Sequence, residues 1–209
     1  MHDHDAEVDD PSRDGQAKNT ARLHTALDAL TAIDSATLPA GDRDDREMLI
    51  NSIKGTLLDV ETIRYWQKDP DVYVRSATSA VFNLVHRDFA PLADRLRSVI
   101  ARERQIPMLL ATGKANIEHP PRAFVDIAIR NVAGSITFLK IGAPATFAAV
   151  EDQELKREFT ASNDSAIAAF EDYKTYLEQE LKPGLCWGGR SSASSKVSAL
   201  ASSPMRTIS

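Results

Sequence analysis

Residues 66–89, WQKDPDVYVRSATSAVFNLVHRDF, constrain the fold more than any other stretch of the chain. Asp69 is a good N-cap acceptor. The ring of Pro70 presets a helical φ at a position where a backbone N–H is not needed. The stretch therefore predicts a corner between two helices. The apolar residues of the second helix recur at helical spacing and form one stripe, namely Tyr73, Ala77, Ala80, Leu84 and Val85.

Two large aromatic residues, Trp66 and Tyr73, flank this corner. Rings of this size can close the angle between two packed helices, and this is the simpler interpretation. The alternative is that the rings take part in binding a ligand. The spacing alone is compatible with both.

The same helical period recurs along the rest of the chain. Prolines, glycines and capping residues divide it into segments. The expected fold is all-α, a single helical domain of about six to eight helices over residues 18–183. Before the Trp66 corner, helices are expected over residues 21–33 and from an Asp44–Glu47 capping box to the corner itself. After it, one helix is expected to start at Pro91, one to run from Pro107 to Gly113, and one to run from Pro121 to Gly142 and Pro144. The last is expected over residues 151–182, with a break near Ser162 and Asn163.

The last of these helices carries a nearly continuous apolar seam in steps of three or four residues, close to a coiled-coil pattern. An intramolecular helical hairpin or a dimer contact would satisfy such a seam, and the hairpin is favoured. The seam consists of Leu155, Phe159, Ser162, Ala166, Phe170, Tyr173, Leu177 and Leu181.

Both ends of the chain differ in composition from its middle. Residues 1–17 are acidic and polar, and residues 184–209 are rich in serine and contain no acidic residue. Neither segment can bury enough apolar surface to offset the entropy of ordering, so both are predicted to be disordered tails. His2 and His4 alternate with aspartates and would bind a divalent ion weakly at best. The abrupt change after Pro183 suggests a truncated or frameshifted gene product.

Charge and cysteine content narrow the class of protein. The formal net charge of -5 is carried almost entirely by the acidic N-terminus, so the body is close to neutral and nucleic acid is not expected as a partner. Arg95, Arg97, Arg102 and Arg104 are expected on a solvated or ion-paired helix face. No apolar run is long enough to span a bilayer. A single cysteine and the absence of a secretory pattern predict a cytoplasmic protein.

Motifs that would indicate catalysis are missing from the sequence. It contains no G-x-S-x-G elbow, no G-x-G-x-x-G loop and no G-K-[ST] phosphate loop. Glu118-His119 lacks a second histidine four residues on, and His24 and His86 have no nearby Cys or His partner in sequence. Both histidines are expected to cap a helix or lie at the edge of the core. We therefore predict no catalytic, cofactor-binding or metal-binding residue in this chain.

An ordered series of short motifs resembles a known family. The motifs are Trp66, Asp69-Pro70, Tyr73, Arg87-Asp88-Phe89-Ala90-Pro91, Arg95, Ile106-Pro107 with Leu110, Asn116 and Pro120-Pro121. Over residues 23–183 they resemble the N-terminal half of the bacterial domain of unknown function 885 family. That resemblance implies a helical, carboxypeptidase-like zinc metallopeptidase in full-length members.

The zinc-binding segments of the family have no counterpart in this chain. The resemblance therefore implies an N-terminal helical portion that is inactive alone and lines one side of a substrate cleft. Apolar faces left uncovered would make the isolated chain self-associate. Two alternatives remain: a helical interaction or dimerisation module that uses the seam of residues 155–181, and a helical ligand-binding regulator. The regulator is disfavoured because no basic recognition helix is present.

Overall fold

The computed structural model describes residues 10–184 of the 209-residue chain. This part is 84% helical and contains no strand, which confirms the all-α class. Most of the two predicted tails falls on residues 1–9 and 185–209, outside the described residues. The histidine pair His2 and His4 and the lone Cys186 also lie there.

The helices follow one another through short connections. Three π-helical segments continue α2, α7 and α9: η2 (Leu58–Ile63), η3 (Phe138–Gly142) and η4 (Tyr176–Leu181). In chain order the α-helices are α1 (Arg13–Ala32), α2 (Ala40–Leu57), α3 (Tyr65–Lys68), α4 (Asp71–His86), α5 (Leu92–Glu103), α6 (Ile106–Asn116), α7 (Arg122–Thr137), α8 (Ala143–Thr146) and α9 (Gln153–Thr175).

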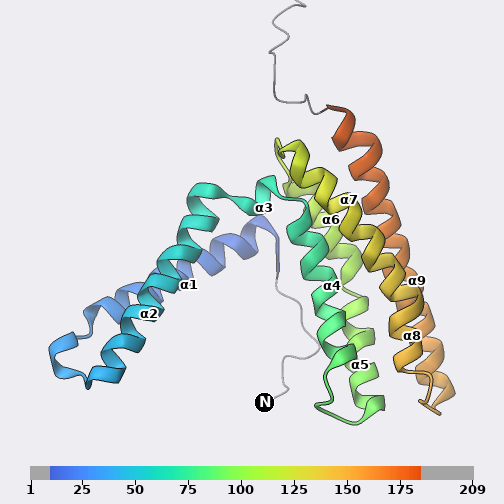
Figure 1. Ribbon diagram of the computed structural model, residues 1–209, viewed down its shortest axis with the longest axis horizontal. Helices are drawn as coiled ribbons and strands as arrows, with labels where there is room; N and C mark the ends of the chain where they lie inside the picture. The colour runs from blue at the N-terminus through green and yellow to red at the C-terminus, as the bar shows by residue number, and fades with distance from the viewer. Residues whose placement is uncertain (1–9, 185–209) are drawn as a thin grey trace, which may run out of the picture.

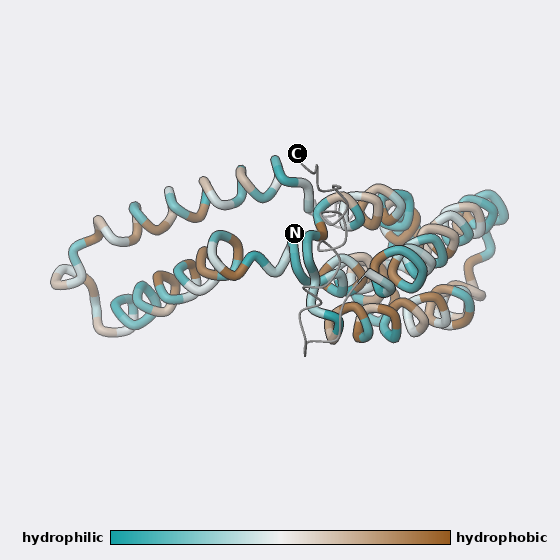
Figure 2. Tube along the Cα trace, turned by 90° about the horizontal axis from the view of Figure 1, so that it is seen from above, coloured by the Kyte–Doolittle hydropathy of each residue, from teal (hydrophilic) through white to brown (hydrophobic). Residues whose placement is uncertain are grey.

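The chain has two parts of very different burial. Figure 1 shows α1 and α2 as a helical hairpin that projects away from a bundle formed by α4 to α9, with α3 at the junction. Seen from above in Figure 2, the hairpin again stands apart from the bundle. No residue of α1 is buried, and Leu57 is the one buried residue of α2. The hairpin therefore draws little stability from a core of its own.

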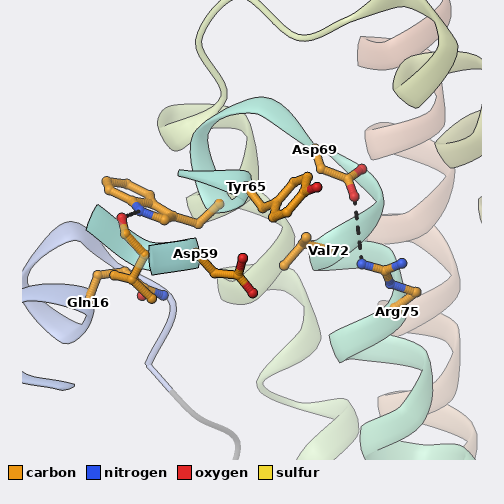
Figure 3. Close-up of a pocket in the computed structure, with 8 residues that line it drawn as sticks. Gln16, Asp59, Tyr65, Asp69, Val72 and Arg75 are labelled. Carbon is orange, nitrogen blue, oxygen red and sulfur yellow. Dashed lines mark hydrogen bonds and ion pairs between the residues drawn. The ribbon is translucent and has the colours of Figure 1, made fainter. Parts of the chain in front are cut away.

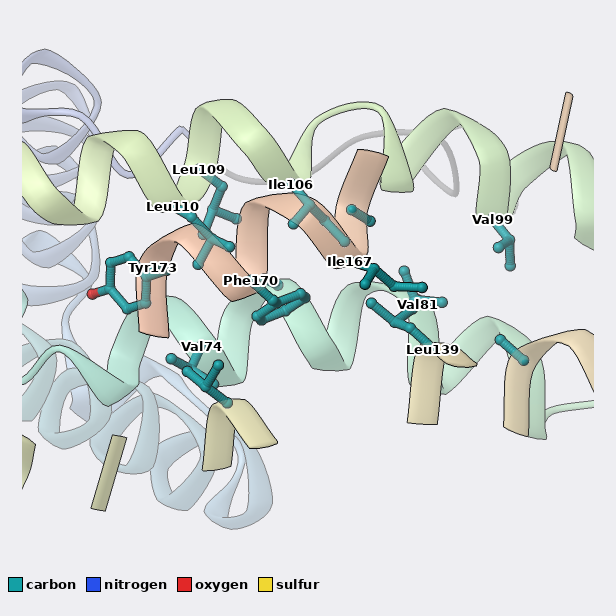
Figure 4. Packing of buried hydrophobic residues seen from close by; sticks show 14 of the residues in the cluster. Val74, Val81, Val99, Ile106, Leu109, Leu110, Leu139, Ile167, Phe170 and Tyr173 are labelled. Carbon is teal, nitrogen blue, oxygen red and sulfur yellow. The ribbon is translucent and has the colours of Figure 1, made fainter. Parts of the chain in front are cut away.

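The hydrophobic core lies in the bundle. Side chains from α4, α5, α6 and α9 meet Leu139 of η3, as the close view in Figure 4 shows. Buried side chains of α7 belong to the same core. Phe170 and Tyr173 of α9 are completely buried at its centre. Burying an aromatic side chain of this kind contributes about 1.5–3 kcal/mol. Helix α9 packs against α5, α6 and α7, so it connects these three helices.

The predicted corner before α4 is confirmed. The Asp69 carboxylate accepts a hydrogen bond from the backbone N–H of Asp71 at 3.0 Å, with Pro70 between them. This bond satisfies one of the N–H groups that a helix N-terminus leaves unpaired. The predicted stripe on the following helix is also confirmed, because all five of its residues are buried, namely Tyr73, Ala77, Ala80, Leu84 and Val85.

Two helices begin earlier than the sequence predicted. Helix α1 begins at Arg13, inside the predicted tail of residues 1–17, because the Ser12 hydroxyl caps it by accepting from the Gly15 N–H at 3.0 Å. Helix α2 begins at Ala40, directly after Pro39, so the proposed Asp44–Glu47 capping box lies inside the helix.

Two predicted helix ends were also placed wrongly. Helix α6 continues past Gly113 to Asn116. Helix α7 passes through η3 into α8, and Pro144 lies in the first turn of α8. A glycine or proline therefore marks a helix end only where the surrounding structure allows no continuation.

The seam of the last helix is filled from within the molecule. Every seam residue from Leu155 to Leu177 is buried, and Leu181 packs partly against the same core. The intramolecular alternative is therefore confirmed, and the seam is not available as a dimer contact. The predicted break near Ser162 and Asn163 is wrong. The Ser162 hydroxyl donates to Glu103, and the Asn163 amide donates to the Leu139 carbonyl at 3.1 Å.

Candidate functional site

A cavity of about 530 Å³ lies where the hairpin meets the bundle. The residues that line it come from α1, η2, α3 and α4, so neither part forms it alone. Figure 3 shows Asp59 and Tyr65 on the hairpin side, facing Val72 of α4, with Asp69 and Arg75 at the other end. The full lining is Gln16, Asp59, Val60, Tyr65, Trp66, Asp69, Val72 and Arg75.

The aromatic corner holds this cavity in shape. Helix α2 and η2 end at Arg64, whose left-handed φ of 56° turns the chain into α3. The Trp66 indole N–H then donates to the Val60 carbonyl at 3.1 Å, and the Tyr73 hydroxyl donates to the Trp66 carbonyl. The corner-closing interpretation of the two rings is confirmed. Trp66 also lines the cavity, which is compatible with the alternative of a ligand contact.

A second set of contacts ties the hairpin to the bundle. Arg13 of α1 forms an ion pair with Glu118, and its guanidinium lies over the ring of Trp66 at 5.6 Å from the centroid. The Asn116 side-chain amide donates to the Pro11 carbonyl at 2.8 Å and to the Tyr73 hydroxyl at 3.0 Å. These contacts place the start of α1 at the aromatic corner, on one side of the cavity.

The charges of the cavity are unevenly balanced. The Arg75 guanidinium lies 3.6 Å from both the Asp69 and the Asp71 carboxylates. Burial raises the pKa of Asp69 above its ordinary value, although the N–H of Asp71 and the charge of Arg75 act in the opposite direction. Within the described residues, Asp59 makes no ion pair. The lining therefore carries more negative than positive charge.

The two histidines differ in how they meet the expectation of a helix-capping or core-edge residue. His86 is the last residue of α4 and meets it, whereas His24 lies in the middle of α1, which buries no residue, and does not. His24 Nε2 is 2.9 Å from a Glu61 carboxylate oxygen. The ring of His86 stacks on Phe82 at 3.9 Å between centroids, and its Nδ1 is 3.0 Å from the Phe82 carbonyl oxygen. Within residues 10–184, no group of three or more His, Cys, Asp or Glu side chains is placed to hold a metal ion.

The predicted arginine face of α5 is only partly solvated. Arg97 pairs with Asp94 at 2.7 Å, and Arg104 pairs with Glu158 at 2.8 Å, as expected for an ion-paired face. Arg95 departs from the prediction because it is 5% exposed. Its guanidinium donates to the carbonyls of Leu84 and Val85 and to Asp88, so it closes the C-terminal end of α4.

The sequence predicted the corner between the two helices but not the cavity beside it. Asp69 and Trp66 were identified from capping and ring size, whereas Gln16, Asp59 and Arg75 gave no local signal. Asp59 lies on the polar side of its helix, and Gln16 belongs to a segment predicted to be disordered. Their meeting depends on how the hairpin joins the bundle at the aromatic corner.

Comparisons with known proteins place the fold within a longer protein. No curated protein matches this chain. A solved structure described as "a putative lipoprotein of unknown function from Shewanella oneidensis" matches with a TM-score of 0.75 at 24% identity. The match covers 85% of this chain and 32% of the other, so this chain spans about a third of that protein. At this identity the likeness shows the fold alone.

Among the described residues, no helix is both long and apolar enough to cross a bilayer.

The family is established by a separate match. Residues 1–186 match the family described as bacterial protein of unknown function, DUF885. Because this match covers most of the chain, the protein belongs to the DUF885 family.

Proposed function

We propose that this chain is a non-catalytic helical portion of a zinc-peptidase-like protein, in which it lines one side of a substrate cleft. The observation that carries the proposal is the structural match, which covers 85% of this chain but 32% of a longer protein. The peptidase part of the proposal comes from the ordered motifs around Trp66, Asp69-Pro70 and Pro120-Pro121.

The described residues do not fit a catalytic zinc ion. Such a site needs three protein ligands, usually His, Glu or Cys, converging on one point. His24 already faces Glu61, His86 is stacked on Phe82, and no third ligand-type side chain joins either of them in the described part of the chain. In this proposal, the residues that bind zinc belong to sequence outside residues 10–184.

The cavity between the hairpin and the bundle, the junction cavity, is the part of this chain that would face a substrate. It is open to solvent, lies between two separately packed parts and combines aromatic with carboxylate side chains. Binding sites are commonly found at such boundaries between structural units. A long cleft that is lined by further chain on the opposite side would continue from it.

A hydrolysis assay with two proteins tests the proposal. This chain and the longer Shewanella oneidensis protein are incubated with a mixture of fluorogenic peptides, with added Zn²⁺ and, separately, with a chelator. We expect chelator-sensitive hydrolysis by the longer protein and none by this chain. Hydrolysis by this chain would contradict the proposal that it is non-catalytic. Inactivity of the longer protein would remove the peptidase part of the proposal.

A second candidate function is suggested by an apolar surface on the bundle. We define the aromatic face as Phe82, His86, Phe138 and Ile141, which come from α4 and η3. Phe82 is 44% exposed and Ile141 is 66% exposed, and Phe82 lies 5.4 Å from Phe138 between ring centroids. We propose that additional chain, as present in the longer relative, covers this face, and that the isolated protein self-associates through it.

Sedimentation velocity tests the aromatic face. We expect the isolated protein to form concentration-dependent oligomers, and Ile141→Asp to reduce them. Met48→Asp is the matched control, because Met48 is 67% exposed but lies on the hairpin. A monomer at every concentration, or an equal effect of both substitutions, would contradict the proposed role of this face.

A further inference from the structure

The junction cavity has an apolar wall on which a ligand stem can lie. Val60 and Val72 face it from the two parts of the molecule, and the rings of Tyr65 and Trp66 border it. Tyr65 is 42% exposed although it is large and aromatic, and its ring is 6.3 Å from Phe124 between centroids. An exposed ring beside a cavity leaves one face free for contact with a bound group.

The polar groups of the cavity select for positive charge. Among its lining residues Arg75 alone is basic, and its guanidinium is divided between Asp69 and Asp71. The Asp71 carboxylate also accepts from the Asn131 amide at 2.9 Å, so this pair is held in place from α7. An anionic ligand near Arg75 would have to approach these carboxylates and would be repelled.

Asp59 lies between Gln16 and Val72, on the hairpin side of Tyr65 and away from the Arg75 pair (Figure 3). Within the described residues it makes no ion pair, so its carboxylate is available to a ligand. Asp69 is 14% exposed at its side chain, and its basic partner Arg75, 3.6 Å away, is 63% exposed and shared with Asp71. Two carboxylates that flank an aromatic ring match an ammonium or guanidinium group.

The corner already binds one cation within the chain. The guanidinium of Arg13 lies 5.6 Å from the centroid of the Trp66 ring and also pairs with Glu118. The same chemistry, an aromatic ring beside a carboxylate, is repeated inside the cavity by Tyr65 and Asp59. Here no described basic side chain occupies it.

We infer that the junction cavity binds an organic cation, a primary ammonium or guanidinium group on an apolar stem, with the charge beside Asp59 and the stem between Tyr65 and Val72. This inference goes beyond the proposed peptidase role and does not require it. The cation could belong to a free amine or to a lysine or arginine side chain of a peptide.

An NMR titration of the ¹⁵N-labelled full chain tests the inference. The probes are 2-phenylethylammonium and its neutral counterpart 2-phenylethanol. A second pair is the tripeptide acetyl-Ala-Lys-Ala-amide and its glutamine counterpart. We expect the amide signals of residues 59–75 to shift, and a cation to bind about tenfold more tightly than its neutral counterpart, as for a charge-assisted contact. The pair with the larger ratio identifies the source of the cation.

Two substitutions make the test specific. Asp59→Asn removes the charge without removing a contact that holds the fold, and it should abolish the preference for the cation. Asp45→Asn is the matched control, because Asp45 is an exposed aspartate of the same helix outside the cavity. The inference is overturned by equal binding of charged and neutral probes, by unchanged binding to the Asp59→Asn protein, or by no shift at the solubility limit. Since no hydrolysis is measured, failure here leaves the peptidase proposal unaffected.

Discussion

The Ser162 hydroxyl donates a hydrogen bond to the Glu103 carboxyl group at 2.5 Å, across the contact between α9 and α5. Glu103 is completely buried, and its second carboxyl oxygen has no hydrogen-bond partner within the described residues. An ionised carboxylate at such a position is strongly disfavoured, because the core offers no solvation for the charge.

Burial raises the pKa of Glu103 to about 8, with the bond from Ser162 opposing part of the shift. The folded protein therefore binds more protons than the unfolded chain between the ordinary carboxyl pKa and about 8. The free energy of unfolding should therefore fall as the pH rises from the ordinary carboxyl pKa to about 8, by at most about 1.4 kcal/mol per pH unit. Urea unfolding of wild type and Glu103→Gln from pH 5 to 9 measures this, because the variant should lose this part of the pH dependence. Glu158→Gln, at an exposed position, should follow wild type. Parallel curves for Glu103→Gln and wild type would show that Glu103 ionises normally.

Gly113 is predicted to be irreplaceable because of Tyr73. A Cβ at this position would lie 2.7 Å from the Tyr73 Cγ, and Tyr73 is 1% exposed and hydrogen-bonded at its hydroxyl. We expect Gly113→Ala to destabilise the protein by about 1–3 kcal/mol through overpacking. Thermal and urea unfolding measure the effect. Gly55→Ala is the control, because a Cβ there meets nothing within 4 Å, and it should stabilise by about 0.5–1 kcal/mol. Equal responses would contradict the close contact.

The buried Arg95 is predicted to stabilise the end of α4. Arg95→Met keeps much of the side-chain volume but leaves the Leu84 and Val85 carbonyls without their donors. We expect a loss of about 2–4 kcal/mol in the free energy of unfolding. Arg97→Met, which breaks an exposed pair with Asp94, should cost less than about 1 kcal/mol. If both variants have the same stability, the carbonyl contacts of Arg95 contribute little.

The hairpin is predicted to open more readily than the bundle. Helix α1 buries no residue, and few contacts join the hairpin to the bundle besides those at Arg13 and Asn116. Hydrogen exchange should therefore be faster in α1 and α2 than in α4 or α9. Arg13→Ala should accelerate exchange in the hairpin while the melting temperature of the bundle stays nearly constant. Uniform exchange across the chain would show that the two parts unfold together.

The sequence by itself determined the features that depend on neighbouring residues. The Asp69-Pro70 start of α4, its buried stripe and the restart of a helix at Pro107 follow from local capping and periodicity. The all-α class follows because the same period repeats along most of the chain. The apolar seam of α9 was also predicted from the sequence. Whether it packs within the molecule or forms a dimer contact was decided only by its burial within one molecule.

The tertiary structure decided everything that depends on residues far apart in sequence. In the sequence Gly113 looks like a helix stop, whereas in the structure it makes room for the ring of Tyr73. In the sequence Arg95 looks like a surface charge, whereas in the structure it donates to a carbonyl at the end of α4. The cavity joins Gln16 and Asp59 to Arg75 only because the start of α1 and η2 both lie at the aromatic corner. The physical reason is that capping and periodicity act within one or two helical turns and indicate which face of a helix is buried, whereas the residues that this face meets depend on how distant helices pack together.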